Sequence, residues 1–374
     1  MLNVHCSMLN AARPLTLGIQ HSAQKLSHKP KLARSTDTGN ANELAKRAAR
    51  TERAGEAARE KVNIQHYRLS ISPACSRAVL TVSLSLAVAA VAAAQQTFRA
   101  SVDLVHFGVV VTDKQGQPIT GLTADDFEIK EAGKPQAIKF FTAGDPETAP
   151  PLHIGFLLDT SGSMGEDIKD VRTAAIKFLN AMERAEDITL VDFDTEVRMG
   201  RYSGSEYARL IERIRGRKAD GYTALYDALG VYLSGTADQT GQKILVMYTD
   251  GGDTRSTLTI HEIVDLMRAS DVTVYVVGYL EHQSSSGRAS QRMELSRFAT
   301  MTGGLALFPT SVKDVDKMYE KIQREITARY SLGYTSTDER TNGAWRSVEI
   351  RLKRNDLKGA KLRTRDGYFA PFKK

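Results

Sequence analysis

From residue 152 onward, short apolar runs alternate with stretches of helical spacing, and this alternation limits the fold more than any other feature of the chain. The strand-like runs are 153–158, 188–193, 243–249, 272–277 and 305–308, with a short edge strand at 196–199. The helical stretches are 166–184, 203–215, 223–234, 259–269, 293–301 and 312–330. Buried strands that alternate with helices predict an α/β fold whose sheet is Rossmann-like, doubly wound and mostly parallel. The polar stretch 283–291 is predicted to be a mobile loop.

Both ends of this α/β region are flanked by β-rich sequence. Before it, strands are predicted at 101–112, within 124–130 and at 137–141, and a proline-containing linker at 145–151. After it, strands are predicted at 330–335, 345–353 and 361–364. We expect the two β segments, 95–148 and 329–374, to pair as one small all-β sandwich. The α/β domain, 152–328, would then be an insertion in that sandwich.

The basic excess of the chain is confined to its first quarter. The formal net charge is +7, but residues 1–94 hold 13 Lys or Arg against 5 Asp or Glu, so the remainder carries −1. A nearly neutral folded part lacks the basic surface that nucleic-acid binding requires, and we expect no nucleic-acid partner. Cys6 and Cys75 both precede residue 95, so the body of the chain has neither a disulfide nor a thiolate metal site.

Residues 78–94 have the features of a secretory signal. Their apolar run follows Arg68 and Arg77 and ends in Ala92-Ala93-Ala94. The run is short for a transmembrane helix, so an uncleaved anchor is the alternative, and only that alternative implies membrane contact. Residues 1–77 are polar and basic, and we interpret them as disordered or as an extension that results from a start codon assigned too far upstream. The predicted protein is exported, to the periplasm or the cell surface.

A loop with regularly spaced oxygen ligands follows the first apolar strand of the α/β region. Asp159, Ser161 and Ser163 occupy alternate positions, and Gly162 gives the backbone the freedom to turn all three toward one point. The carboxyl ends of parallel strands are where open α/β sheets bind ligands. Carboxylate and hydroxyl oxygens are hard ligands that suit Mg²⁺, Mn²⁺ or Ca²⁺. The loop is therefore a candidate metal site.

Two later positions add oxygen ligands at the same predicted edge of the sheet. Thr223 lies at the start of a predicted helix, and Asp250 follows the strand 243–249. The Asp159 loop could be only a helix cap, as could Thr223, because Ser, Thr and Asp favour that position. A cap alone leaves the other positions unexplained, so the set of five favours a metal site.

These five positions resemble the metal-ion-dependent adhesion site of the von Willebrand factor A family, which uses D-x-S-x-S, a later Thr and a later Asp. The resemblance covers about 152–328. It implies that Ser161, Ser163 and Thr223 contact the metal directly, and that Asp159 and Asp250 act directly or through water. The flanking segments GLTADDFE and RDGYFAP are similar to those of bacterial proteins related to this family.

This arrangement predicts binding rather than catalysis. Two carboxylates roughly balance a divalent ion, and an ion that prefers six oxygens keeps a position open for an Asp or Glu of a protein partner. We therefore expect a metal-dependent adhesion or interaction module and not an enzyme. A metal-dependent hydrolase is one alternative, although no general base stands out beyond Asp159 and Asp250. An accessory assembly subunit whose metal is incidental is the other.

Several further residues invite a functional interpretation that the sequence does not favour. Asp192 and Asp194 resemble a phosphatase pair, but Glu196 stands where that motif needs Thr or Val. The other candidates are predicted to be structural or solvent-exposed: Asp227, His106, His153, His261 with Glu262, and the Tyr222/Tyr226 pair, for which ligand contact stays open. The sequence contains no nucleophile elbow, Walker loop or dinucleotide-binding fingerprint.

Overall fold

The computed structural model describes residues 104–144 and 148–372. The predicted extension (1–77) and signal segment (78–94) lie outside these residues, as do both cysteines. All described residues belong to one compact unit. None of the helices in the described part of the chain is long and apolar enough to cross a bilayer.

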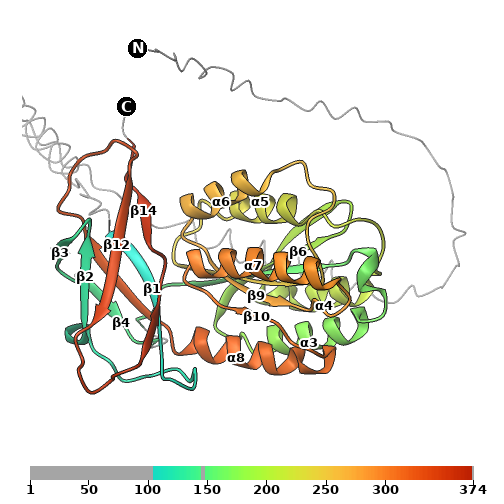
Figure 1. The fold of residues 1–374 in the computed structure, drawn as a ribbon, viewed down its shortest axis with the longest axis horizontal. Coiled ribbons are helices and arrows are strands. Elements are labelled where there is room, and N and C mark those ends of the chain that lie inside the picture. The colour runs from blue at the N-terminus through green and yellow to red at the C-terminus, as the bar shows by residue number, and fades with distance from the viewer. Residues whose placement is uncertain (1–103, 145–147, 373–374) are drawn as a thin grey trace, which may run out of the picture. The chain divides into compact units, whose positions relative to one another are not determined.

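A six-stranded sheet forms the centre of the α/β region (Figure 1). Its strand order is β10 (Ala306–Leu307), β9 (Thr273–Gly278), β8 (Gln242–Thr249), β5 (Leu152–Asp159), β6 (Ala185–Phe193) and β7 (Val197–Ser203). The first five strands are parallel, and β7 is an antiparallel edge strand. Seven of the eight residues of β5 are buried, so this strand needs apolar cover on both faces.

Helices provide that cover on each side of the sheet (Figure 1). One face packs against α3 (Ile168–Asn180), α4 (Tyr207–Gly216) and α8 (Val315–Thr327), and the other against α5 (Leu225–Gly235), α6 (Ile260–Ala269) and α7 (Ser285–Met301). Successive strand residues point to opposite faces, so Phe156 contacts Phe178 and Tyr319 while Leu157 belongs to the opposite core. The predicted doubly wound α/β fold is confirmed. Short 3₁₀ helices are η1 (Ala124–Asp126), η2 (Gly162–Gly165), η3 (Gly204–Glu206) and η4 (Val312–Asp314).

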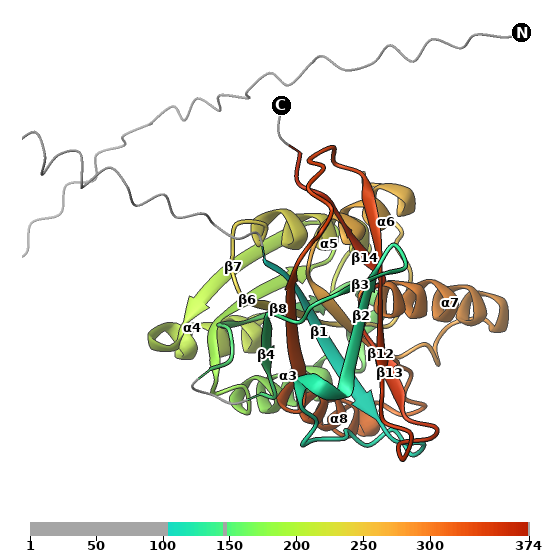
Figure 2. The ribbon, with the colours of Figure 1, turned by 90° about the vertical axis from the view of Figure 1, so that its left-hand side faces the viewer.

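Two four-stranded antiparallel sheets are built from both flanking segments (Figure 2). One has the order β13 (Lys361–Arg363), β1 (Leu104–Thr112), β11 (Tyr330–Thr335) and β4 (Phe140–Thr142). The other has the order β14 (Gly367–Phe369), β12 (Trp345–Leu352), β2 (Phe127–Glu131) and β3 (Lys134–Gln136). Because β1 pairs with β11 and β2 pairs with β12, each sheet joins strands that precede the α/β region to strands that follow it.

The predicted mobile loop at 283–291 is wrong, because residues from Ser285 onward form the first half of α7. The side chain of Ser284 accepts a hydrogen bond from the Gly287 backbone N–H and caps this helix. The first turns of α7 are mostly exposed, so they carry no apolar stripe from which helical periodicity could be read.

The predicted strand at 137–141 is misplaced. The chain leaves one sheet at the end of β3 and enters the other at Phe140, so residues 137–139 cross between sheets. Over this crossing the backbone is anchored by a hydrogen bond from Lys139 N–H to the Gly333 carbonyl. The crossing segment keeps the alternating side-chain pattern of a strand, although it does not form a ladder of hydrogen bonds with either sheet.

Candidate metal centre

The predicted ligands lie at the carboxyl-terminal edge of the central sheet. Asp159 is the last residue of β5, and η2 holds Ser163 immediately after it. Asp250 directly follows β8, which is the neighbour of β5 in the sheet. Parallel neighbours end at the same edge, so strand pairing alone brings these two loops together.

Four of the five predicted residues are joined by side-chain hydrogen bonds. The Ser161 hydroxyl donates to Asp159 Oδ1 at 2.6 Å, and the Ser163 hydroxyl donates to Asp250 Oδ1 at 2.9 Å. The two serine Oγ atoms lie 3.1 Å apart. Two carboxylates and two hydroxyls from separate loops therefore converge on one point.

Thr223 lies in the third loop, just before α5, and is largely buried. This loop is tied to the first one by backbone hydrogen bonds from Gly162 N–H to the Gly221 carbonyl, at 3.0 Å, and from Asp220 N–H to the Thr160 carbonyl, at 2.9 Å. Within the described residues, no hydrogen bond connects the Thr223 side chain with the other four. The structure therefore places the Thr223 loop beside the cluster, and its role as a ligand stays a prediction.

The charge of this cluster is unbalanced. Asp159 and Asp250 are both 0 % exposed, and among the described residues neither forms an ion pair with a basic side chain. Burial and the nearby Asp250 carboxylate raise the pKa of Asp159 to about 7, and burial likewise raises the pKa of Asp250. Asp250 Oδ2 is buried, and no hydrogen-bond partner for it lies in the described part of the chain. Hard oxygen ligands, two buried carboxylates and an unpartnered oxygen fit a divalent cation.

Two residues that the sequence did not single out, Thr249 and Gln283, support the cluster, and a third, His282, lies near Asp250. The Thr249 hydroxyl donates to Asp159 Oδ2 at 2.7 Å, so both oxygens of Asp159 are held in place. Gln283 Nε2 donates to the Asp250 carbonyl at 3.1 Å, and His282 Nε2 lies 2.8 Å from an oxygen of Asp167. Thr249 could have been found as the residue before Asp250, but His282 and Gln283 lie beside and within the stretch that was interpreted as a mobile loop.

Asp192, which the sequence did not favour as part of a phosphatase pair, and Asp227, which was expected to be structural, both make structural contacts. Asp192 is fully buried and forms ion pairs with Arg198, Arg213 and Arg217. The Asp227 carboxylate accepts hydrogen bonds from backbone N–H groups of Thr257 and Leu258, which fixes the loop before α6. These contacts occupy both carboxylates and leave neither directed at the metal centre.

The remaining candidates lie away from the cluster or at its rim. His153 bridges Asp187 and the Thr240 carbonyl, and Glu262 completes the cap of α6 with Thr259. The Tyr226 hydroxyl donates to Glu294, whereas Tyr222 is 65 % exposed beside Thr223. Of the two tyrosines, Tyr222 is therefore the one that is free to meet a partner.

A comparison with known families finds a match over the α/β region. The family model described as the von Willebrand factor type A domain matches residues 153–325. None of the curated proteins that were compared with the chain matches it.

Solved structures with a similar fold include three examples. The PilB minor pilin from Streptococcus sanguinis is 15 % identical, with a TM-score of 0.40; the match covers 48 % of this chain and 62 % of the pilin, so the chain spans less than two thirds of its length. A von Willebrand factor type A protein from Catenulispora acidiphila is 12 % identical, with coverage of 74 % and 76 % and a TM-score of 0.41. Proximal thread matrix protein 1 from the mussel byssus, with a zinc-occupied MIDAS motif, is 16 % identical, with coverage of 54 % and 50 % and a TM-score of 0.41.

Proposed function

We propose that the von Willebrand factor type A domain at residues 153–325 holds a divalent cation and binds an acidic group of a protein partner there. The cation would be Mg²⁺, or the similar Mn²⁺ or Ca²⁺, and its ligands would be Asp159, Ser161, Ser163, Thr223 and Asp250. The observation that carries this proposal is the pair of buried carboxylates that no basic side chain of the described residues neutralises. Such a pair is costly unless a cation joins it.

The chain's own residues prepare this site in the absence of a partner. Thr249 and Ser161 hold the two oxygens of Asp159, while Ser163 orients Asp250. Gln283 ties the backbone of Asp250 to the segment before α7. A bound cation with an open coordination position would accept a carboxylate oxygen from an Asp or Glu of the partner. The exposed Tyr222 ring would lie at the rim of that contact.

Binding is proposed in preference to catalysis because no well-placed general base stands out among the described residues around the site. His282 is the histidine at this edge, and its hydrogen bond with Asp167 raises its pKa. A histidine that holds its proton more firmly is less suited to remove a proton from water at neutral pH. The same side chain is suited to attract an acidic partner.

Metal binding is the first test of this proposal. We expect Mg²⁺ or Mn²⁺ to raise the Tm of the chelator-treated protein, and Asp250→Asn to abolish that rise. Thr223→Ala should weaken metal binding without changing the stability of the metal-free protein, and Thr223→Ser should restore it. Asp238→Asn, at an exposed aspartate in the loop that precedes β8, is the matched control and should respond like the wild type. An unchanged metal response in Asp250→Asn would refute the ligand set.

Partner binding is the second test. Immobilised protein should retain a partner from envelope extract in Mg²⁺ and release it in chelator, and Asp250→Asn should retain none. A partner that is held equally in chelator would support the accessory-subunit alternative. Metal-dependent hydrolysis of phosphoesters or peptides that is lost in Asp250→Asn would support the hydrolase alternative.

We also propose that the protein is exported to the periplasm or cell surface. Support comes from the signal-like sequence of residues 78–94, which lies outside the described residues. N-terminal sequencing of the native protein should find a mature end directly after Ala94. A mature end upstream of that position would contradict cleavage there.

A further inference from the structure

Arg329 is a buried cation whose charge is not matched. It lies between α8 and β11 and is 6 % exposed. Its Nη2 donates to the Thr273 hydroxyl at 2.5 Å, but Nε and Nη1 have no hydrogen-bond partner among the residues that the structure describes. Burial lowers the pKa of Arg329, which reflects the cost of keeping the guanidinium away from water. A buried guanidinium with two unused nitrogens calls for an anion.

The carboxylates nearest to Arg329 are already paired with other cations. Glu325 forms an ion pair with Arg363 at 2.5 Å, and Asp271 forms one with Lys243 at 2.6 Å. Lys243 is itself 6 % exposed and also donates to the Gln239 carbonyl. In the described part of the chain, no carboxylate forms an ion pair with Arg329. The protein therefore buries more positive than negative charge at this place.

A cavity of about 190 Å³ lies beside the guanidinium. Its polar lining comprises Arg329, Lys243, Asp271, Ser331, His106, Thr240 and Gln242. Gly108 of β1 also lines it, and a Cβ atom at that position would lie 2.0 Å from Arg329 Nε. The guanidinium thus lies directly on the β1 backbone, and only a glycine leaves room for it. The cavity is large enough to hold several water-sized groups or one small ion.

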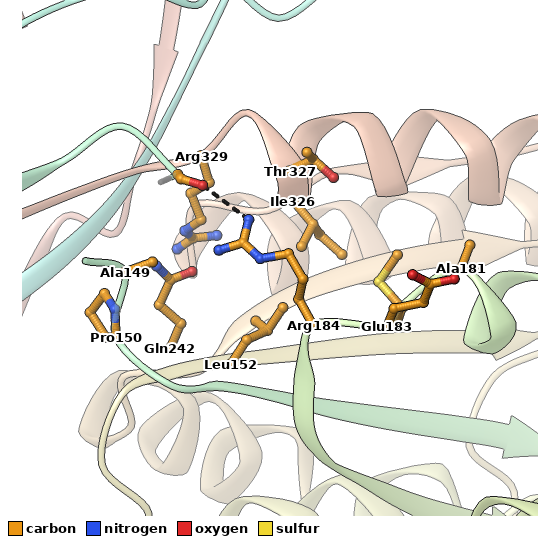
Figure 3. A pocket seen from close by; sticks show the side chains of 12 residues that line it. Ala149, Pro150, Leu152, Ala181, Glu183, Arg184, Gln242, Ile326, Thr327 and Arg329 are labelled. Carbon is orange, nitrogen blue, oxygen red and sulfur yellow. Dashed lines mark hydrogen bonds between the residues drawn. The ribbon is translucent and has the colours of Figure 1, made fainter. Parts of the chain in front are cut away.

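Figure 3 shows Arg329 from an adjoining cavity, which shares Pro150, Gln242 and Arg329 with the first. Arg184 also lines this second cavity, and its Nη1 donates to the Gly144 carbonyl at 3.0 Å. Arg184 is exposed and has found a protein acceptor, whereas Arg329 is buried and has two nitrogens without one. Arg184 is therefore a suitable control for experiments on Arg329.

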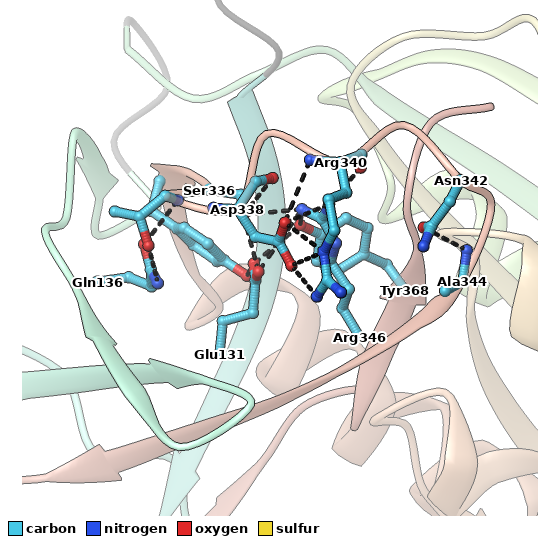
Figure 4. Close-up of polar contacts among 11 residues, drawn as sticks. Glu131, Gln136, Ser336, Asp338, Arg340, Asn342, Ala344, Arg346 and Tyr368 are labelled. Carbon is cyan, nitrogen blue, oxygen red and sulfur yellow. Dashed lines mark hydrogen bonds and ion pairs between the residues drawn. The ribbon is translucent and has the colours of Figure 1, made fainter. Parts of the chain in front are cut away.

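Elsewhere in the two four-stranded sheets, a buried charge is satisfied by its neighbours (Figure 4). The Glu131 carboxylate accepts hydrogen bonds from the hydroxyls of Tyr334, Tyr368 and Ser336, and Arg346 lies 3.6 Å from it. No comparable set of partners surrounds Arg329 among the described residues. The unmatched charge is thus a local feature of this cavity.

We propose that this cavity binds a small oxyanion, of the carboxylate or phosphate class, through the free nitrogens of Arg329. The Ser331 hydroxyl also lines the cavity, while Lys243 and Asp271 at its wall form an ion pair with each other, so the unmatched charge there is that of Arg329. The site lies at the amino-terminal ends of β5, β8 and β9, whereas the metal centre lies at their carboxyl-terminal ends. The inference is therefore independent of the proposed metal-dependent function.

The test is thermal unfolding of the chelator-treated protein in phosphate, sulfate or acetate, against chloride at equal ionic strength. At about ten times Kd we expect an oxyanion to raise Tm by about 3–5 °C and the effect to saturate. A response to phosphate and sulfate alone would indicate a tetrahedral ligand, and a response to acetate a planar carboxylate. A wild-type protein whose Tm follows ionic strength alone, without saturation, would overturn the proposal.

Variants separate a binding site from a structural arginine. Arg329→Met removes the unmatched charge at similar volume, so it should abolish the oxyanion response while the Tm in chloride stays the same or rises. Gly108→Ala should displace the guanidinium and also abolish the response, which provides a second variant if the first does not fold. Arg184→Gln is the matched control and should respond like the wild type. An undiminished response in Arg329→Met or Gly108→Ala would refute the site.

Discussion

The two edges of the central sheet bury charges of opposite sign, and within residues 104–144 and 148–372 neither charge is paired with an opposite one. At the carboxyl-terminal edge, Asp159 and Asp250 are buried without a basic partner. At the amino-terminal edge, Arg329 is buried without an acidic partner. The same physical argument therefore predicts a cation at one edge and an oxyanion at the other.

A third buried charge, that of Asp192, is neutralised by arginine side chains of the protein itself. Asp192 in β6 is as buried as Asp159, yet Arg213 Nε lies 2.6 Å from Oδ1 and Arg217 Nε lies 2.9 Å from Oδ2. Burial of a carboxylate alone thus does not indicate a binding site. The proposed sites differ from Asp192 in that no opposite charge among the described residues is paired with them.

The largest loss in the free energy of unfolding should come from removing a buried carboxylate that is paired with arginines. Asp192→Ala leaves three guanidiniums around an empty position, and we expect it to lower the free energy of unfolding by about 3–5 kcal/mol. Chemical denaturation of the chelator-treated protein measures this. A loss as small as that of an exposed aspartate variant would show that Asp192 is no more structural than the metal-site carboxylates.

The next largest effect is the pH dependence of stability that the unmatched Asp159 carboxylate causes in metal-free protein. Its pKa of about 7 lies above the unfolded value near 4, so the folded state holds this proton more tightly. Stability should therefore be greatest below pH 4 as far as this group is concerned, and should fall by at most about 4 kcal/mol as pH rises to 7 and above. Denaturation across this pH range measures the slope.

Asp159→Asn is the control for that slope. The variant should lack the decrease and should be more stable than the metal-free wild type at pH 7 and above. A saturating divalent cation should remove most of the decrease from the wild type. An identical slope in Asp159→Asn would assign the pH dependence to other groups.

A smaller effect is expected from the residue that supports Asp159. Thr249→Val keeps the shape of the β8 side chain but removes the hydrogen bond to Asp159 Oδ2, and should cost about 1–2 kcal/mol. The free energy of unfolding, measured with and without Asp159→Asn, checks this. If the cost is the same in both backgrounds, it does not arise from the contact with Asp159.

The smallest effect belongs to the exposed pair at the rim. His282 is 42 % exposed at its side chain, so its contact with Asp167 is largely screened by water. His282→Gln should change the free energy of unfolding by less than about 0.5 kcal/mol. A much larger loss in denaturation experiments would mean that the segment before α7 is held by this pair rather than by Gln283.

The fold class could be predicted because the signals for it are local. Strands such as β5 and β8 are continuous apolar runs, and helices such as α3 and α8 have one apolar face, so each element was recognisable within its own sequence. The errors arose where local pattern and tertiary role differ. The first half of α7 is a helix without an apolar stripe, and residues 137–139 alternate like a strand while they cross between two sheets.

Only part of the candidate metal centre could be predicted from the sequence. The order of strands in a parallel sheet brings the ends of β5 and β8 to one edge, so the meeting of Asp159 with Asp250 follows from two recognisable strands. The contribution of Gln283 depends on the path of the chain between β9 and α7, which no motif encodes. Its contact could therefore be seen only in the folded molecule.

By itself, the sequence determined the doubly wound sheet, the β-rich flanks and the spacing of the oxygen ligands, because each depends on residues close together in the chain. Only the tertiary structure decided which buried charges are matched. Arg329, Thr273 and Gly108 come from three distant segments, and whether a partner reaches the guanidinium depends on how those segments pack. The free-energy cost of burying a charge depends on its neighbours in space, and those neighbours are set by the fold as a whole.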